Sequence, residues 1–178
     1  YGERGQDVLL ESADSGFGFL ADLCRDWEEA ARSVDAVGWR RVHPRIGVVL
    51  HPDGGALRRM LPPFRLGLGG PIGDGRQAFP WIHLEDWVGL LLFCLDNAGV
   101  VGPVNVVAPY PVTNSEFTQA LGSALHRPAF LPLPKLVLRL LIGEAAEILT
   151  SSQRCSAQRA ETLGYEFLHP RIGQALYH

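Results

Sequence analysis

A helix-like segment followed by a buried strand places the strongest constraint on the fold of this chain. Apolar residues recur at helical spacing between residues 19 and 37, and Gly38 follows as a helix stop. Residues 40–50, RRVHPRIGVVL, end in a continuous apolar run that is typical of a strand buried on both faces. A helix, a tight turn and a buried strand make half of a βαβ unit. The sequence therefore predicts an α/β fold with parallel strands.

A proline interrupts this predicted strand in its middle. Pro44 has no backbone N–H, so it cannot donate a hydrogen bond to a neighbouring strand. We therefore expect the pairing of the strand to be broken locally at Pro44.

Further helices and short strands follow, and the stretch just after residue 126 is rich in proline. Residues 56–64 predict a short helix ended by Pro62-Pro63, and a longer helix begins close to Leu84. A capping box at Thr113-Asn-Ser-Glu116 predicts another helix to about residue 125. The proline-punctuated stretch after residue 126 divides the chain into a larger part, residues 1–126, and a small C-terminal helical module, residues 127–178.

Within that module a helix is predicted from Lys135 to about Leu149, because Pro134 suits the first turn of a helix. Ser156 is a candidate cap for a short helix that ends at Gly164, and a last helical turn precedes His178.

Composition excludes several classes of protein. A net charge of −3 argues against a nucleic-acid partner. No apolar run reaches the 18 residues that a membrane span needs. Three cysteines without a C-x-x-C pair, and six histidines without ligand spacing, favour neither a disulfide scaffold nor a metal site. We expect a protein of the reducing cytoplasm that binds no metal. Its oligomeric state is open.

The segment from Gly67 to Trp87 is the richest in functional side chains. It holds five glycines within nine residues, followed by Arg76, Gln77, Trp81, His83 and Asp86. A dinucleotide-binding fingerprint needs a helix that opens directly from the glycines, whereas here Pro71 and a polar stretch intervene. The segment therefore predicts a binding loop rather than a phosphate cradle.

Two interpretations of the residues that close this segment stay open. His83 with Glu85 and Asp86 offers a histidine and carboxylates for acid–base work. The same carboxylates would also suit the positive end of a helix dipole, with His83 in a structural hydrogen bond. Spacing alone favours the structural interpretation. Trp81, which stands in a polar context, is the residue expected to be more open.

A set of short motifs spread over the chain resembles one known family. The chain resembles an atypical extended short-chain dehydrogenase/reductase family of NAD(P)-dependent epimerase/dehydratase-like (nucleoside-diphosphate-sugar epimerase-like) proteins. The motifs are Tyr1-Gly2, Trp27-Glu28, Arg45-Ile-Gly-Val-Val-Leu50, Gly54-Gly-Ala56, Pro63-Phe-Arg-Leu-Gly-Leu-Gly-Gly-Pro71, Gly75-Arg-Gln77, Trp81-Ile-His83, Glu85-Asp86, Gly102-Pro-Val-Asn105, Thr113-Asn114, Glu116-Phe117 and Arg127-Pro128. Gly143-Glu144, Gln153-Arg154 and Leu163-Gly-Tyr-Glu-Phe167 resemble the small C-terminal module of that family.

The resemblance implies that this chain is the C-terminal part of a Rossmann-like parallel sheet with a small, mostly helical substrate lobe. The main loop for NADP or NAD is then expected upstream of Tyr1, a start that is not methionine. Contacts to the cofactor are implied at Arg45, Gly47 and Val49. Contacts to a small-molecule substrate are implied at Arg76, Gln77, Trp81, His83 and Asp86.

The superfamily's Tyr-x-x-x-Lys pair is absent from the sequence. The only lysine is Lys135, and Leu131 stands four residues before it. Alignment through Trp27-Glu28 puts Leu20 and Cys24 at the positions of the pair. Two functions follow as expectations. One is redox chemistry on a sugar nucleotide or another hydroxyl-bearing molecule. The other is non-catalytic NADP(H) binding with a regulatory or interaction role, for which cell division is one setting.

Overall fold

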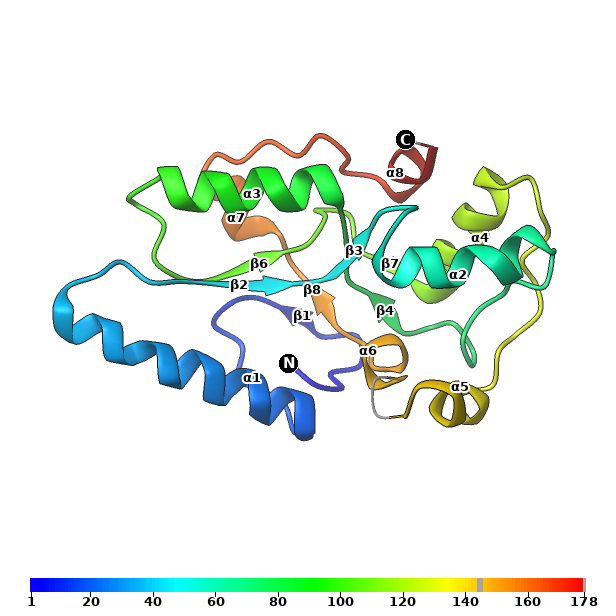
Figure 1. Cartoon of the computed structure of the whole chain (residues 1–178), viewed down its shortest axis with the longest axis horizontal. Coiled ribbons are helices and arrows are strands. Elements are labelled where there is room, and N and C mark those ends of the chain that lie inside the picture. The colour runs from blue at the N-terminus through cyan, green and yellow to red at the C-terminus, as the bar shows by residue number, and fades with distance from the viewer. Residues whose placement is uncertain (144–145, 178) are drawn as a thin grey trace.

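Two parallel strands form the centre of the fold in the computed structural model, which describes residues 1–143 and 146–177 (Figure 1). Strand β2 (Val42–Ile46) pairs with β6 (Gly102–Val106) over its whole length. After Gly47 the chain continues as β3 (Val48–Leu50), which pairs in parallel with β5 (Trp81–His83). The predicted α/β class with parallel strands is therefore confirmed.

Helices cover the two faces of this sheet. Helix α1 (Phe19–Ala30) lies on one side of β2, while α3 (Leu84–Asp96) and α7 (Gln158–Thr162) lie on the other (Figure 1). Leu90 and Cys94 of α3 join Ala160 of α7 in a buried cluster with the strand residues Val104 and Val106. The helix predicted to reach residue 37 changes at residue 31 into a 3₁₀ helix, η1 (Ala31–Val37).

Pairing at Pro44 is intact, contrary to the expectation from sequence. Pro44 stands in register with Val104, within an unbroken ladder. The reason is the direction of the backbone groups. Gly102 N donates to Arg41 O, and Gly47 N donates to Val106 O. Backbone groups alternate in direction along a strand. Pro44 therefore faces away from β6, and its missing N–H removes nothing from that ladder.

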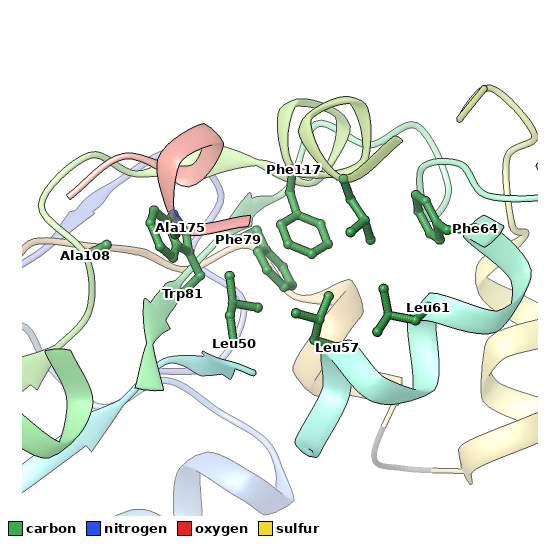
Figure 2. Packing of buried hydrophobic residues seen from close by; sticks show 10 residues of the cluster. Leu50, Leu57, Leu61, Phe64, Phe79, Trp81, Ala108, Phe117 and Ala175 are labelled. Atoms are coloured by element: carbon green, nitrogen blue, oxygen red, sulfur yellow. The ribbon is translucent and has the colours of Figure 1, made fainter. Parts of the chain in front are cut away.

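A second layer packs around β4 (Ala78–Phe79) and β7 (Val112–Thr113), which pair antiparallel. Helix α2 (Gly55–Arg65) and helix α4 (Asn114–Ala124) enclose this pair. Their apolar faces form the largest core, drawn in Figure 2, with Phe79 and Phe117 at a ring-centroid distance of 4.5 Å. The capping box that predicted α4 is present, because Thr113 Oγ1 accepts from Glu116 N and the Glu116 carboxylate accepts from Thr113 N.

The two prolines expected to end α2 lie inside its last turn. Pro62 and Pro63 are exposed on one side of the helix, whereas Leu61 and Phe64 are buried on the other. The carbonyls that lose an N–H partner are those of Arg58 and Arg59, one turn earlier on the exposed side of α2, where water can replace the donor.

The segment after residue 126 returns repeatedly to the rest of the chain. It contains α5 (Lys135–Ile142), α6 (Ala146–Thr150), β8 (Arg154–Cys155), α7 and α8 (Ile172–Tyr177). Strand β8 pairs in parallel with β1 (Val8–Leu9), and Ala175 of α8 lies in the core of Figure 2. The boundary at residues 126/127 stays a prediction, and Glu144 of the family motif lies outside the described residues. None of the helices within residues 1–143 and 146–177 has the length and apolar character that a bilayer crossing requires.

Candidate functional site

A cavity of about 520 Å³ lies between α1 and the edge of β2 that faces away from β6. Six consecutive residues, from Val42 to Gly47, line one wall, and Ala21, Cys24 and Trp27 of α1 line another. At the carboxyl end of β2 the cavity is closed by residues from distant segments. They are Tyr1, Pro80, Val107, Gln153 and Cys155.

The Arg45 side chain spans this cavity's inner wall and is held on several sides. Its Nε and Nη2 donate to the two carboxylate oxygens of Glu28 at 2.7 and 2.8 Å. Its Nη1 donates to the hydroxyl of Tyr1 at 2.8 Å, and the guanidinium carbon lies 4.9 Å from the centroid of that ring. Such a two-pronged pair is among the stronger charge-assisted contacts in proteins. Arg45 therefore fixes the N-terminal segment and α1 against β2.

The charges in this network stabilise one another. The hydrogen bonds from Arg45 hold the pKa of the Glu28 carboxyl below its ordinary value. Burial raises the pKa of the Tyr1 hydroxyl, although Arg45 opposes that effect. The Tyr1 hydroxyl donates to Asn105 Oδ1 at 2.8 Å, and the buried Asn105 amide donates to Leu9 O and Ser156 O. The polar groups of this wall are thus mutually satisfied, as buried groups must be.

The three residues expected to contact a cofactor occupy different positions. Arg45 and Gly47 line the cavity. A Cβ on Gly47 would come within 3.0 Å of Pro80 backbone atoms and of Val107 Cγ1, so the site has no room for a side chain. Val49 stands in the middle of β3 opposite Ile82, and its side chain packs in the α3 core. The three contacts stay predictions, but Val49 lies apart from the other two.

The glycine-rich segment is fastened to its surroundings by backbone hydrogen bonds. Leu131 N donates to Gly69 O, Gly73 N donates to Leu133 O, and Ser115 N donates to Gly75 O. A Cβ on Gly70 would come within 2.1 Å of the Leu131 carbonyl oxygen. The glycines therefore allow close approach of the 128–135 stretch, a role in packing rather than in holding phosphate.

The residues that follow these glycines are mostly buried within this chain, and the substrate contacts expected of them stay predictions. Trp81 is 1% exposed and lies in β5, inside the core of Figure 2, so it is not the open residue expected from sequence. Gln77 is buried, and its amide donates to Ile72 O. Arg76 is exposed, with its backbone N–H bonded to Asp74. The physical reason is that residues 78–83 form two short strands, which turn the chain inward.

Asp86 is fully buried and holds the C-terminal segment in place. Its two carboxylate oxygens accept from the backbone N–H of Leu168 at 2.7 Å and of His169 at 2.8 Å. The hydroxyl of Tyr165 donates to Asp86 O at 3.1 Å. Burial and the nearby carboxylate raise the pKa of Tyr165. Asp86 thus serves as an anchor, and its carboxylate is not accessible to a substrate.

The side chains next to this anchor meet those of the C-terminal segment. Glu85 Oε2 lies 2.8 Å from His169 Nε2, and the rings of His83 and His169 have centroids 4.0 Å apart. His83 Nδ1 also accepts from Glu85 N at 3.3 Å, which caps α3. No local pattern in the sequence links His169 to this pair, because 84 residues separate Glu85 from His169.

The residues expected at the positions of the Tyr-Lys pair, Leu20 and Cys24, lie on α1. Cys24 is exposed on α1 and lines the cavity, one helical turn after Leu20. Lys135 lies elsewhere, with its side chain against Gly73. Of the described residues that line the cavity, none is a lysine.

Comparisons with known proteins show similarity to epimerase family proteins. A domain of unknown function, DUF1731, matches residues 133–178. An epimerase family protein of Mycobacterium tuberculosis is 48% identical over 177 residues, which are 99% of this chain and 59% of that protein. Epimerase family protein SDR39U1 of Mus musculus is 47% identical over 167 residues, 93% of this chain and 57% of that protein. The chain thus spans about three-fifths of the length of these relatives.

Solved structures agree with the sequence relatives. The human epimerase family protein SDR39U1, crystallised with NADPH, has a TM-score of 0.92 and 42% identity, over 99% of this chain and 60% of that one. A nucleoside-diphosphate sugar epimerase from Corynebacterium glutamicum has a TM-score of 0.77 and 32% identity, over 98% of this chain and 34% of that one.

Proposed function

Because this chain is a homologue of the epimerase family proteins and carries the DUF1731 domain, we propose that it forms the nicotinamide and substrate side of an NADP(H)-binding site. The cavity at the carboxyl end of β2 is the observation that carries the proposal. In open α/β sheets, ligands bind beyond the carboxyl ends of the parallel strands. Gly47 follows β2, Val107 follows β6, and both line the cavity at this end.

The charges of the cavity suit the nicotinamide end of the cofactor better than its pyrophosphate. Its two arginines are already matched with carboxylates, Arg25 with Asp22 at 2.9 Å and Arg45 with Glu28 at 2.7 Å. Its volume of about 520 Å³ lies in the range of small-molecule sites. When bound, the cofactor would supply or accept a hydride. The part of this chain is to exclude water and to orient the ring against Gly47 and Val107.

We place the remaining two-fifths of the relatives' length along the free edge of β2. In that arrangement a parallel strand lies beside β2 and accepts hydrogen bonds from the backbone N–H groups of Val42 and Ile46, which face away from β6. Exposed apolar side chains on α1 and in the segment just before β2 support the arrangement. Trp27 is 67% exposed and Trp39 is 71% exposed. Large apolar groups that gather on a surface usually mark an interface.

Hydride transfer at a hydroxyl carbon of a sugar nucleotide, or of another hydroxyl-bearing small molecule, is the proposed reaction. Residues 66–77 and the polar tip at Arg76 are the part of the chain proposed to cover that substrate. The side chains of Gln77, Trp81 and His83 are all buried, so they would support this surface from within the chain.

Non-catalytic NADP(H) binding is the second candidate, and one observation favours it. The α1 positions matched to the Tyr-Lys pair hold Leu20 and Cys24, and the single lysine packs against Gly73. In the Tyr-x-x-x-Lys pair the lysine lowers the pKa of the tyrosine beside the nicotinamide. This chain has no lysine at that position that could do so. A protein built this way would hold the cofactor and transmit its redox state to a partner.

Titration of the full-length protein with NADPH and NADH tests the proposal. We expect NADPH binding in the micromolar range or tighter. Cys24→Phe, which projects into the cavity, should weaken binding at least tenfold, whereas the control Ala30→Phe on the same helix should bind like wild type. A panel of sugar nucleotides then separates the two candidates: NADPH consumption favours the enzyme, and binding without turnover favours the second candidate. Absence of binding would contradict both.

A further inference from the structure

We propose that His83, Glu85 and His169 form a binding site for a divalent transition metal such as Zn²⁺. The ligand atoms of the three side chains, one from each residue, all lie within 4.8 Å of one another. Glu85 Oε2 and His169 Nε2 are 2.8 Å apart, and the two imidazole rings lie side by side with centroids 4.0 Å apart. Three donors that converge from two distant segments define a common point between them.

The donor set selects the class of ion. Two imidazoles and one carboxylate are ligands of zinc in proteins, where three such ligands leave a fourth position for water. Imidazole nitrogen suits Zn²⁺, Ni²⁺ and Cu²⁺, whereas Mg²⁺ and Ca²⁺ take oxygen ligands. The half-exposed Glu85 side chain lies on the solvent side of the group, so the fourth position opens to water.

The geometry requires only a small adjustment. Zinc–ligand bonds of about 2.0–2.2 Å place tetrahedral donors roughly 3.3–3.5 Å apart. Donors as far apart as 4.8 Å must therefore approach by at most about 1.5 Å, while Glu85 Oε2 and His169 Nε2, now 2.8 Å apart, must separate by roughly 0.5 Å. Glu85 can supply this movement, because its side chain is 50% exposed. The buried His83 would give up the long 3.3 Å bond to Glu85 N, which is a weak cap.

The surroundings favour positive charge at this point. The Asp86 carboxylate is fully buried next to Glu85 and receives its hydrogen bonds from neutral donors: two backbone N–H groups and the hydroxyl of Tyr165. One of those N–H groups belongs to His169 itself, so the same anchor fixes the backbone of a proposed ligand. A buried carboxylate close to an ion stabilises that ion in a medium of low dielectric constant.

The proposed ion would join the start of α3 to the C-terminal segment, which are 84 residues apart in sequence. It would therefore act as a cross-link between the core and the C-terminal module, in the same place where Asp86 already holds that segment. The proposal concerns this chain's own stability and does not depend on the proposed cofactor site.

Thermal unfolding of the tag-free protein tests the proposal, after treatment with EDTA and dialysis. Addition of Zn²⁺ at a hundredfold excess over Kd should raise Tm by roughly 5–10 °C for a chain of this size, and Mg²⁺ should leave Tm unchanged. Co²⁺ should give visible absorption bands of a four-coordinate site. Glu85→Gln and His169→Gln should each weaken Co²⁺ binding at least tenfold. The control Glu166→Gln removes the same charge from an exposed carboxylate three residues from His169, and should bind like wild type.

Two results would overturn the proposal. One is a wild-type protein whose Tm and Co²⁺ spectrum do not respond to the metals. The other is a response that persists unchanged in both Glu85→Gln and His169→Gln, which would indicate binding at other surface groups. Glu85→Gln keeps the test valid if His169→Gln fails to fold, because the Glu85 side chain is half-exposed and its removal leaves Asp86 and the core intact.

Discussion

Two regions of the molecule differ in how completely this chain encloses them. Around β4 and β5, Phe117, Phe79 and Trp81 are at most 2% exposed and lie within a continuous core. Around β2 and α1, Trp27 is 67% exposed, Phe19 is 62% exposed, and the backbone edge beyond Val42 and Ile46 has no strand beside it among the described residues. The two regions contain similar residue types, yet only one of them buries those residues.

This difference separates two uses of apolar side chains. In the enclosed region they supply the free energy of folding, since each buried aromatic ring contributes a few kcal/mol. In the open region they remain in water and mark a surface that another segment can cover. Substitutions in the enclosed region should therefore lower the stability of this chain. Substitutions in the open region should leave that stability nearly unchanged and weaken assembly with the proposed upstream part.

Phe117→Ala should have the largest effect. The ring is fully buried against Phe79, so its removal should lower the free energy of unfolding by about 3–5 kcal/mol. Denaturant titration of this chain measures the change, with Trp27→Ala as the matched control. Trp27→Ala should change stability by no more than about 0.5 kcal/mol. Equal losses in the two variants would mean that α1 is enclosed in solution and would break the comparison.

Asp86→Asn should have an intermediate effect. An amide can accept from only one of the two N–H groups of Leu168 and His169, and its own NH₂ would face the other. We expect a loss of about 1–3 kcal/mol, because a buried donor is left without a partner. Asp96→Asn at the other, exposed end of α3 is the control and should be neutral or slightly stabilising. A neutral Asp86→Asn variant would show that the C-terminal segment is held by other contacts.

Acidification should have the smallest effect, and it probes the open region. Arg45 lowers the pKa of Glu28 in the folded chain below its ordinary value of 4.5. The ion pair therefore stabilises the fold above pH 4.5 and is lost as the pH falls through the lowered value. Because the pair is only partly buried, we expect less than about 1 kcal/mol. Comparison of wild type with Glu28→Gln between pH 3 and 7, by denaturant titration, isolates this contribution. A difference that grows as the pH falls would contradict it.

Local sequence patterns predicted much of the fold. Helical periodicity, the capping box at Thr113 and the apolar run of residues 46–50 each act within a few residues, so their signals lie side by side in the sequence. The direction in which the backbone nitrogen of Pro44 faces and the position of Pro62 on the exposed side of α2 were not predicted. Both depend on which side of an element faces a neighbour, and that is decided by packing between segments.

The candidate site was harder to predict for the same reason. The Gly67–Trp87 segment looked like a polar loop, but its second half enters two strands whose buried faces are set by contacts with β3 and β7. The alternation Ala78-Phe-Pro-Trp-Ile-His83 was the signal for those strands. The addition of His169 to His83 and Glu85 has no signal in sequence, because it occurs only when the C-terminal segment folds back onto α3.

The orientation of Pro44 has a consequence for the chain in a crowded cell. An unpaired strand edge is a template on which a second copy of the same protein can add its own edge, and this is a route to aggregates. Among the described residues no strand lies beside the outer edge of β2, and Pro44 sits in the middle of that edge with its nitrogen facing outward. Two copies of this chain placed edge to edge would therefore lack a donor at the centre of their contact. The proline leaves the ladder to β6 intact and disfavours pairing of the outer edge of β2 with the same edge of a second copy.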